Sequence, residues 1–211
     1  MKGKNSSPQK WGDLASDDSI AKAKELLIAN GFGVEVVENG QEAKEKVLSI
    51  LPKGAEVMTM TSMTLEAIGV LPAINESVNY DSVRAKLNSM DRATQGREMQ
   101  KMGAAPEWTV GSVHSVTEDG KVMVASNTGS QLPAYAYGAD HVIWVVGTQK
   151  IVANIEEAQA RLYEYTLPLE DERVKEAYGM PNSFVSKQLI FNREVNPDRI
   201  TIIFVKEKLG F

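Results

Sequence analysis

The chain has 211 residues, of which 43% are hydrophobic and 24% are charged, a balance typical of a soluble globular protein. Its net charge is -5 with a sequence pI near 5.2, and because no basic run occurs, a nucleic-acid-binding role has no electrostatic support. The absence of cysteine excludes disulfides, thiolate nucleophiles, zinc sites built on cysteine, and any iron–sulfur cluster held by this chain.

The N-terminal segment is the first element in chain order. Its opening residues, MKGKNSSPQK, are polar and contain no apolar core of a signal peptide. Residues 1–18 are therefore predicted to be a mobile tail, followed by a single domain at residues 19–211. The expected location of such a chain is the cytoplasm.

The first half of the domain alternates helices with short apolar strands. Apolar residues recur at helical spacing in the helices, and Asn39-Gly40 and Pro52 supply turn and stop signals between elements. Strands that alternate with helices of this length indicate βαβ units and a mostly parallel sheet. The predicted elements are helix 19–30, strand 32–37, helix 41–51, strand 55–60, helix 64–71, and a helical stretch over 80–102 with a break near 90–92.

The second half contains more β-structure. Residues 108–126 are predicted to form strands around a hairpin turn at Glu118-Asp119-Gly120. The longest apolar run, Val142–Val146, has the length of a strand and falls far short of the roughly 20 residues needed to span a bilayer, so no membrane insertion is expected. Helices are predicted at 154–165 and 171–178, and the last strand at 200–205.

These elements predict an α/β fold. Continuous apolar strands suit the interior of a parallel sheet that helices cover on both faces. We expect a Rossmann-like, mostly parallel sheet with a smaller antiparallel β element. The central sheet is predicted to include Phe32–Val37, Ala55–Met60, Val142–Val146 and Ile200–Val205.

The stretch TMTSMTLEAIGV, residues 59–70, places hydroxyl side chains where a strand gives way to a helix. Ser62 stands at the position of an N-cap, where its oxygen would accept from a free N–H group of the helix. A capping box would need glutamate at Leu65, and Glu66 comes one residue late, so Glu66 can face something else. Hydroxyls and free N–H groups at a strand end also suit an anion, and the local pattern does not separate a cap from a ligand site.

Two further segments follow predicted strands. In NTGS (127–130), Gly129 allows close approach of the backbone to a ligand, although many ordinary loops have such a composition. In GTQK (147–150), Lys150 either neutralises an anion at the strand ends or lies solvated on the surface. If the strands run parallel, the three segments share one rim. The predicted ligand-binding residues are Ser62, Met63, Thr64, Asn127, Thr128, Gly129, Ser130 and Lys150.

Acidic side chains are the candidate catalytic groups. Glu118 and Glu66 are expected to border the pocket as bases or nucleophiles, although Glu118 and Asp119 also suit a simple turn. His114 lies in a strand and is expected to be a polar-face or packed residue, and with His141 as the only other histidine no metal site is predicted. Dinucleotide-binding, P-loop and nucleophile-elbow motifs are absent, so no cofactor is expected.

Two blocks of the chain resemble a known family. GAEVMTMTSMTLEAIGV resembles the signature S-M-T-x-E-x-I-G of the lactate-utilisation (LUD) domain family. WTVGSVHSVTEDGKVMVASNTGSQLPAYAYGADHVIWVVGTQKIV resembles its second block, and IFVKEKLGF resembles its closing strand and tail. The resemblance covers roughly residues 20–211. It implies a fold similar to ribose-phosphate isomerases, glucosamine-phosphate deaminases and CoA-transferases, which bind anionic metabolites at strand ends.

The resemblance also implies a function. Characterised members are subunits of a bacterial system that oxidises L-lactate to pyruvate, in which partner subunits carry iron–sulfur clusters. Some relatives carry cysteines between the long helix and the final strand, where this chain has EAYGMPNSFVSKQLIFNREVNPDR and none. The chain is thus expected to be a non-redox subunit that binds a small carboxylate, with iron–sulfur oxidoreductase subunits as partners. A homo-oligomer is compatible with this role.

Two alternatives remain open. The first is a stand-alone enzyme acting on a phosphorylated or CoA-activated metabolite, with Glu118 or Glu66 as base or nucleophile. The T-E-D-G turn is similar to the acidic turn that carries the catalytic glutamate of CoA-transferases, an analogy at the level of the fold. The second alternative is a purely structural protein.

Overall fold

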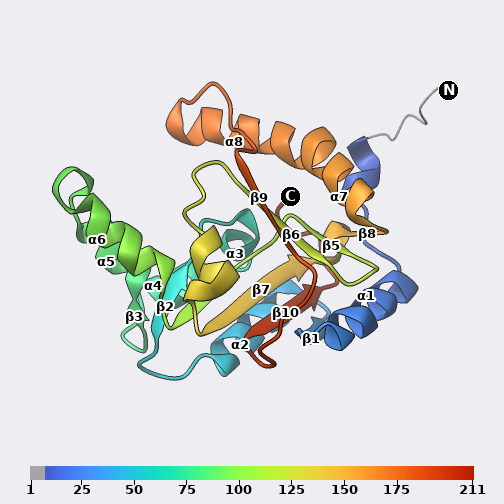
Figure 1. The fold of residues 1–211 in the computed structure, drawn as a ribbon, viewed down its shortest axis with the longest axis horizontal. Coiled ribbons are helices and arrows are strands. Elements are labelled where there is room, and N and C mark those ends of the chain that lie inside the picture. Colours follow the sequence, from blue (N-terminus) through green and yellow to red (C-terminus); the bar gives the residue numbers. More distant parts are fainter. Residues whose placement is uncertain (1–7) are drawn as a thin grey trace.

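The structure, a computed structural model, describes residues 8–211 and contains two β-sheets (Figure 1). All neighbouring strands of the larger sheet run parallel. In spatial order they are β1 (Gly33–Val37), β10 (Ile200–Val205), β7 (His141–Gly147), β4 (Trp108–Gly111), β2 (Glu56–Thr59) and β3 (Asp81–Ser82). The smaller sheet is mixed, with β5–β6 and β6–β9 antiparallel and β5–β8 parallel. Its order is β8 (Ile151–Val152), β5 (Ser115–Thr117), β6 (Val122–Ser126) and β9 (Lys187–Phe191).

Helices connect and cover these strands. Several begin directly after a Ser, Asn or Asp whose side chain accepts from a backbone N–H of the first turn, as helix N-caps do. The α-helices are α1 (Asp17–Ala29), α2 (Gly40–Ile50), α3 (Met63–Ala67), α4 (Val70–Asn75), α5 (Val83–Ser89), α6 (Arg92–Ala104), α7 (Ile155–Arg161) and α8 (Leu167–Tyr178). Short 3-10 turns form η1 (Pro8–Gly12) and η3 (Thr148–Lys150), and π-helical turns form η2 (Ala134–Gly138) and η4 (Leu162–Thr166).

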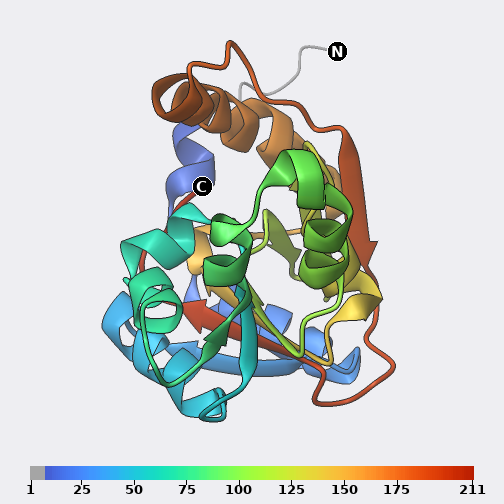
Figure 2. The ribbon, with the colours of Figure 1, turned by 90° about the vertical axis from the view of Figure 1, so that its left-hand side faces the viewer.

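The parallel sheet separates two apolar cores, because successive side chains of a strand point to opposite faces. On β7, Trp144 packs with α1, α5 and the smaller sheet, whereas Ile143 and Val145 pack with α2, α3 and α4. A third cluster lies between the smaller sheet and the stretch α7–η4, which lies on the opposite side of the molecule from α2 (Figure 2). The smaller sheet is thus an inner layer that contacts the parallel sheet on one face.

The predicted fold class is confirmed. The four strands predicted for the central sheet are β1, β2, β7 and β10, and all four lie in the parallel sheet. The apolar runs of β2, β7 and β10 are buried on both faces, which is why they lack a polar alternation, whereas β1 lies at the edge of the sheet and is partly exposed. No helix within residues 8–211 is long and apolar enough to cross a membrane.

Three local expectations are corrected. Of the tail predicted at 1–18, residues 8–12 form η1, whose Trp11 is only 4% exposed in the third apolar cluster, and residues 17–18 begin α1; residues 1–7 lie outside the described part. The helix predicted at 64–71 is divided into α3 and α4 by Gly69, whose φ is 66°. The region 108–126 divides between the sheets, since β4 joins the parallel sheet and only β5 and β6 form the predicted hairpin.

Candidate functional site

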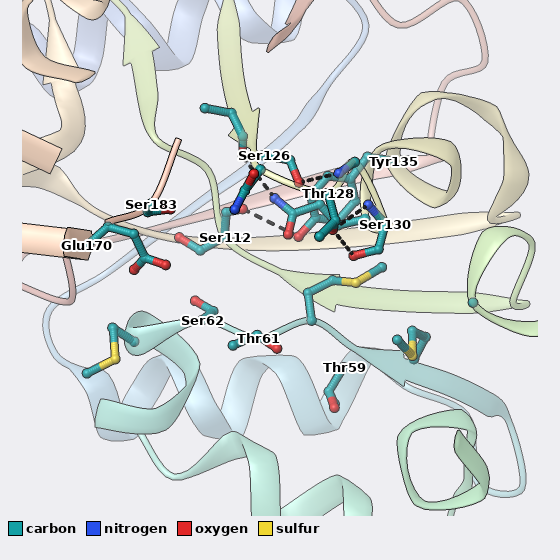
Figure 3. A pocket seen from close by; sticks show the side chains of 18 of the residues that line it. Thr59, Thr61, Ser62, Ser112, Ser126, Thr128, Ser130, Tyr135, Glu170 and Ser183 are labelled. Atoms are coloured by element: carbon teal, nitrogen blue, oxygen red, sulfur yellow. Dashed lines mark hydrogen bonds between the residues drawn. The ribbon is translucent and has the colours of Figure 1, made fainter. Parts of the chain in front are cut away.

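A cleft of about 1580 Å³ lies at the carboxyl ends of the parallel strands. The segments that follow β2, β4 and β7 supply its base, namely Met60–Thr64, Ser112–His114 and Lys150. Figure 3 shows Thr61 and Ser62 on one side of the cleft and Ser112, Ser126, Thr128 and Ser130 on the other. Open α/β sheets bind ligands at this edge.

All eight predicted ligand-binding residues line this one cleft. Asn127, Thr128, Gly129 and Ser130 reach it by a different route from the one expected, because the strand before them, β6, belongs to the smaller sheet. Ser62 also caps α3, since its Oγ accepts from the backbone N–H of Leu65 at 3.4 Å. A helix as short as α3, with five residues, has little dipole to offer an anion, so side chains must supply the charge.

Lys150 lies at the base of the cleft and is 2% exposed. Its Nζ donates to Thr64 Oγ1 at 2.9 Å, to Ser112 Oγ at 3.1 Å and to the carbonyl oxygen of Val113 at 3.2 Å. No carboxylate within residues 8–211 pairs with this amine. Burial, with a smaller contribution from the Arg161 cation, lowers the pKa of Lys150 from 10.5 to about 7.

Lys150 and its hydrogen-bond partners Ser112 and Val113 lie on two connecting segments, called links below, that join the two sheets. Between β4 and β5 the chain passes through Ser112–His114, and between β7 and β8 it passes through Thr148–Lys150. β4 pairs with β7 in the parallel sheet, and β5 pairs with β8 in the smaller sheet. The two links therefore run side by side from the parallel sheet to the smaller one. The amine of Lys150 bonds across from one link to the other.

A second buried cation lies behind this base. Arg161, at the end of α7, is fully buried and donates to the carbonyl oxygen of His114 at 2.7 Å and to Thr166 Oγ1 at 3.0 Å. Its Nε and Nη2 atoms have no hydrogen-bond partner among the described residues. Burial and the Lys150 and Arg161 cations hold the pKa of His114 well below its usual range, so that the imidazole is neutral. The His114 ring accepts from the backbone N–H of Ala125 at 3.1 Å, as a packed residue would.

The outer walls of the cleft add further positive charge. Arg84 is held by the carbonyl oxygen of Thr59, which accepts from its Nε at 3.1 Å and from its Nη2 at 2.8 Å. Arg173 is matched by Glu170 in a bidentate pair with two bonds of 2.7 Å. Six basic side chains and two acidic ones line the cleft, although the whole chain has a net charge of -5. The six are Arg84, Arg92, Arg97, Lys101, Lys150 and Arg173.

The two candidate glutamates separate in the structure. Glu66 lines the cleft, as predicted. The prediction for Glu118 is wrong, because this residue is not among those that line the cleft and its carboxylate accepts from Lys22 Nζ at 2.9 Å. The hydrogen bond from Lys22 is the largest of the contacts that lower the pKa of Glu118. Glu118 therefore ties the β5–β6 turn to α1.

The site contains no evident metal centre. Within residues 8–211, no group of three or more histidine, aspartate or glutamate side chains is placed to hold a metal ion. The polar side chains of the cleft are mostly hydroxyls and basic groups, which donate hydrogen bonds to anions. The arrangement is therefore suited to an anion.

Comparison with known proteins supports the family suggested by the sequence. The model of the LUD domain family matches residues 20–205. The chain belongs to the LUD domain family. A crystal structure of a DUF162 family protein from Deinococcus radiodurans has the same fold, with a TM-score of 0.56 and 13% sequence identity over 92% of this chain and 99% of that one. No curated protein sequence matches the chain.

The cleft of this LUD domain also contains residues that sequence reasoning missed. Ser112 follows the short strand β4, which was not separated from the hairpin after it. Arg84 and Arg173 stand on helices among other charged residues, where no local pattern distinguishes a cleft residue from a solvated one. The burial of Lys150 had one available signal, since the apolar residues Ile151 and Val152 follow it directly.

Proposed function

We propose that this LUD domain binds a small anionic metabolite, a carboxylate or a phosphate, in the cleft at the strand ends. The observation that carries the proposal is the burial of Lys150 at the base of the cleft without a carboxylate partner. Buried cations in proteins are usually paired, because an isolated charge is costly to remove from water. An anionic ligand would supply the missing counter-charge.

The positions of the other charges support the same proposal. Arg161 lies close enough to Lys150 to lower its pKa, and it too has no acidic partner within the described residues. Two unpaired cations raise the potential at the base of the cleft and favour an anion over a neutral or cationic metabolite. Hydroxyls from Ser62, Thr64 and Ser112 would fix the orientation of the ligand.

The family suggests where such a binding protein acts. LUD domains are linked to lactate utilisation, and we infer that this chain serves as a non-redox subunit of an L-lactate oxidation system. Its lack of cysteine means that any iron–sulfur cluster of that system must be carried by other subunits. Co-purification of the tagged chain with iron–sulfur proteins would test this inference, and its isolation without them from lactate-grown cells would contradict it.

The ligand proposal is tested by calorimetric titration of the purified chain with L-lactate, acetate and inorganic phosphate. At a pH of about 6.5 the lysine is mostly charged, and at least one of these anions should bind. Affinity should fall as the pH rises above about 7, because the amine loses its proton. A hydrogen bond to a charged group contributes roughly 1.5–3 kcal/mol, so Lys150→Met should weaken binding by roughly 10- to 100-fold.

Lys53 provides a matched control. It is an exposed lysine that precedes β2 and therefore lies at the opposite end of that strand from the cleft. Lys53→Met removes the same charge from the chain and should leave the affinity unchanged. Equal affinities of the Lys150→Met variant and the unmodified chain, or no binding of any of the three anions, would contradict the proposal.

The stand-alone enzyme remains as a second proposal with reduced support. Glu118 does not line the cleft and Glu66 does, so Glu66 is the candidate base of this enzyme. Glu66 is exposed at the cleft and has room to reach a ligand. Glu66→Gln should leave the affinity for inorganic phosphate intact if Glu66 acts on the ligand and does not bind it, and a large loss of affinity would assign Glu66 to binding instead.

A further inference from the structure

We propose that Lys150 is a nucleophile that forms an imine with an aldehyde or ketone that carries a carboxylate or phosphate group. This inference rests on the proposed function, because the other basic side chains of the cleft, such as Arg84 and Arg92, would hold the anionic group of the substrate while Lys150 faces its carbonyl carbon. It goes further by assigning the amine a covalent role and by naming the class of substrate.

The position of the amine meets the first requirement for such chemistry. Lys150 is one of the residues that line the cleft, and the 2% of its surface that remains exposed leaves little room for bulk water. Hydroxyl and carbonyl oxygens surround its Nζ atom, and no carboxylate of residues 8–211 pairs with it. A carboxylate at this distance would keep the amine protonated and unreactive, and its absence leaves the amine free to attack a carbonyl carbon.

The hydrogen-bond directions show that a neutral amine fits this site. Val113 offers a carbonyl oxygen, which only accepts, and Thr64 Oγ1 donates its own proton to the carbonyl oxygen of Leu209 at 3.1 Å, so it also accepts from Lys150. These two acceptors satisfy both hydrogens of an uncharged –NH₂ group. The Ser112 hydroxyl is the partner that can rotate. It can accept from an ammonium group, or it can turn away and leave the lone pair of the neutral Lys150 amine free to react.

The electrostatic environment favours the same state. Burial and the neighbouring Arg161 cation lower the pKa of Lys150 to about 7, so about half of the amines are neutral at that pH. For an ordinary lysine with a pKa near 10.4, the neutral fraction at pH 7 is about a thousandfold smaller. Lysines whose pKa is depressed by burial or by another cation are the ones that proteins use for imine formation.

The chemical step balances without an oxidant or reductant. The lone pair of Nζ attacks the carbonyl carbon, a C–N bond forms, and one of the two amine protons passes to the carbonyl oxygen to give a carbinolamine. The carbinolamine then loses its hydroxyl group together with the remaining amine proton as water, which breaks the C–O bond and leaves the C=N bond. The Ser112 and Thr64 hydroxyls, both within hydrogen-bond distance of Nζ, are placed to pass protons during these steps.

Reductive trapping tests the inference on the unmodified chain. The protein is incubated with sodium cyanoborohydride and one of four probes: glyoxylate, pyruvate, glycolaldehyde phosphate, or uncharged glycolaldehyde. Mass spectrometry of the peptides then gives the rate of modification of each lysine. We expect Lys150 to be modified by a charged probe at least about a hundredfold faster than the exposed Lys53, because the neutral fraction of Lys150 is much larger than that of an ordinary lysine. The carboxylate and phosphate probes show which anionic group the cleft accepts.

Two further measurements make the result specific. The rate of modification at Lys150 should reach half its maximum near pH 7, as expected for a buried amine. Lys150→Met should lose the fast adduct, and Lys53→Met should keep it. Because the pH profile and the peptide map use the unmodified chain, they remain valid even if Lys150→Met folds poorly.

The outcomes separate this inference from the proposed function. If inorganic phosphate binds in the calorimeter while Lys150 is trapped no faster than surface lysines, the imine is refuted and the binding function stands. If uncharged glycolaldehyde modifies Lys150 as fast as the charged probes, the proposed class of substrate is wrong. If no anion binds and Lys150 is not trapped, both proposals fall.

Discussion

Replacing Lys150 with methionine should change how the stability of the protein depends on pH. Burial lowers the pKa of this amine from 10.5 to about 7. Between these two values the unfolded chain binds a proton that the native state does not bind, so this amine makes the free energy of unfolding rise with pH. Its destabilising effect is complete below about pH 7 and disappears above the unfolded pKa of 10.5.

The magnitude follows from the proton count. One proton of difference corresponds to about 1.4 kcal/mol per pH unit. At pH 7 the native amine is half protonated, so the slope starts at about half this value and approaches the full value near pH 8. Between pH 7 and pH 9 the unmodified chain should therefore gain about 2 kcal/mol relative to Lys150→Met.

Urea unfolding followed by tryptophan fluorescence measures this difference, since Trp11 and Trp144 are buried in the native state. Each protein is unfolded at several pH values between about 7 and 9, and the free energies of the two proteins are subtracted at each pH. Groups distant from Lys150 titrate in both proteins and cancel. Lys53→Met should show no such trend. A constant difference between the unmodified chain and Lys150→Met across this range would refute the depressed pKa of Lys150 and the mechanism built on it.

Three further substitutions test other parts of the structure by urea unfolding. Gly111→Ala should destabilise the fold by roughly 1–3 kcal/mol, because the added Cβ would overlap the hydroxyl of the buried Tyr135, and an unchanged midpoint would contradict this packing. Glu118→Gln should cost less than about 1 kcal/mol, because its pair with Lys22 is partly solvated. It should also leave phosphate affinity unchanged in a titration, and weaker binding would return Glu118 to the site. Trp11→Ala should cost about 3 kcal/mol, since its indole is buried, whereas a mobile segment would show no effect.

Local sequence patterns predicted the parallel sheet because its central strands are buried on both faces. The run ITIIFV became β10 and HVIWVV became most of β7, since continuous apolar stretches of this length suit strands that are covered on both sides. The helix starts were equally local, because Asn39 and Ser62 cap the turns that follow them. Short strands were harder to place. The strand β9 at Lys187–Phe191 escaped prediction, since most of its residues are exposed and only Phe191 is buried.

Some features of the candidate site could likewise be predicted from local sequence and others could not. Residues next to strand ends, such as Ser62 and Thr128, were predicted because the chain places them beside the sheet. The state of Lys150 could not be predicted, because its burial depends on Ser112 and Val113 from a distant segment and on Arg161 behind them. Whether the Lys150 and Arg161 cations have an acidic partner also depends on tertiary structure and not on local sequence.

The two links that carry Ser112 and Lys150 run side by side from the parallel sheet to the smaller sheet. The amine of Lys150 donates to the carbonyl oxygen of Val113 where neither link continues a strand, so a side-chain hydrogen bond joins the links at this point. A substrate that draws the amine toward the cleft would break this hydrogen bond and leave the Val113 carbonyl without it. Lys150 therefore belongs both to the lining of the cleft and to the contact between the two links that join the sheets.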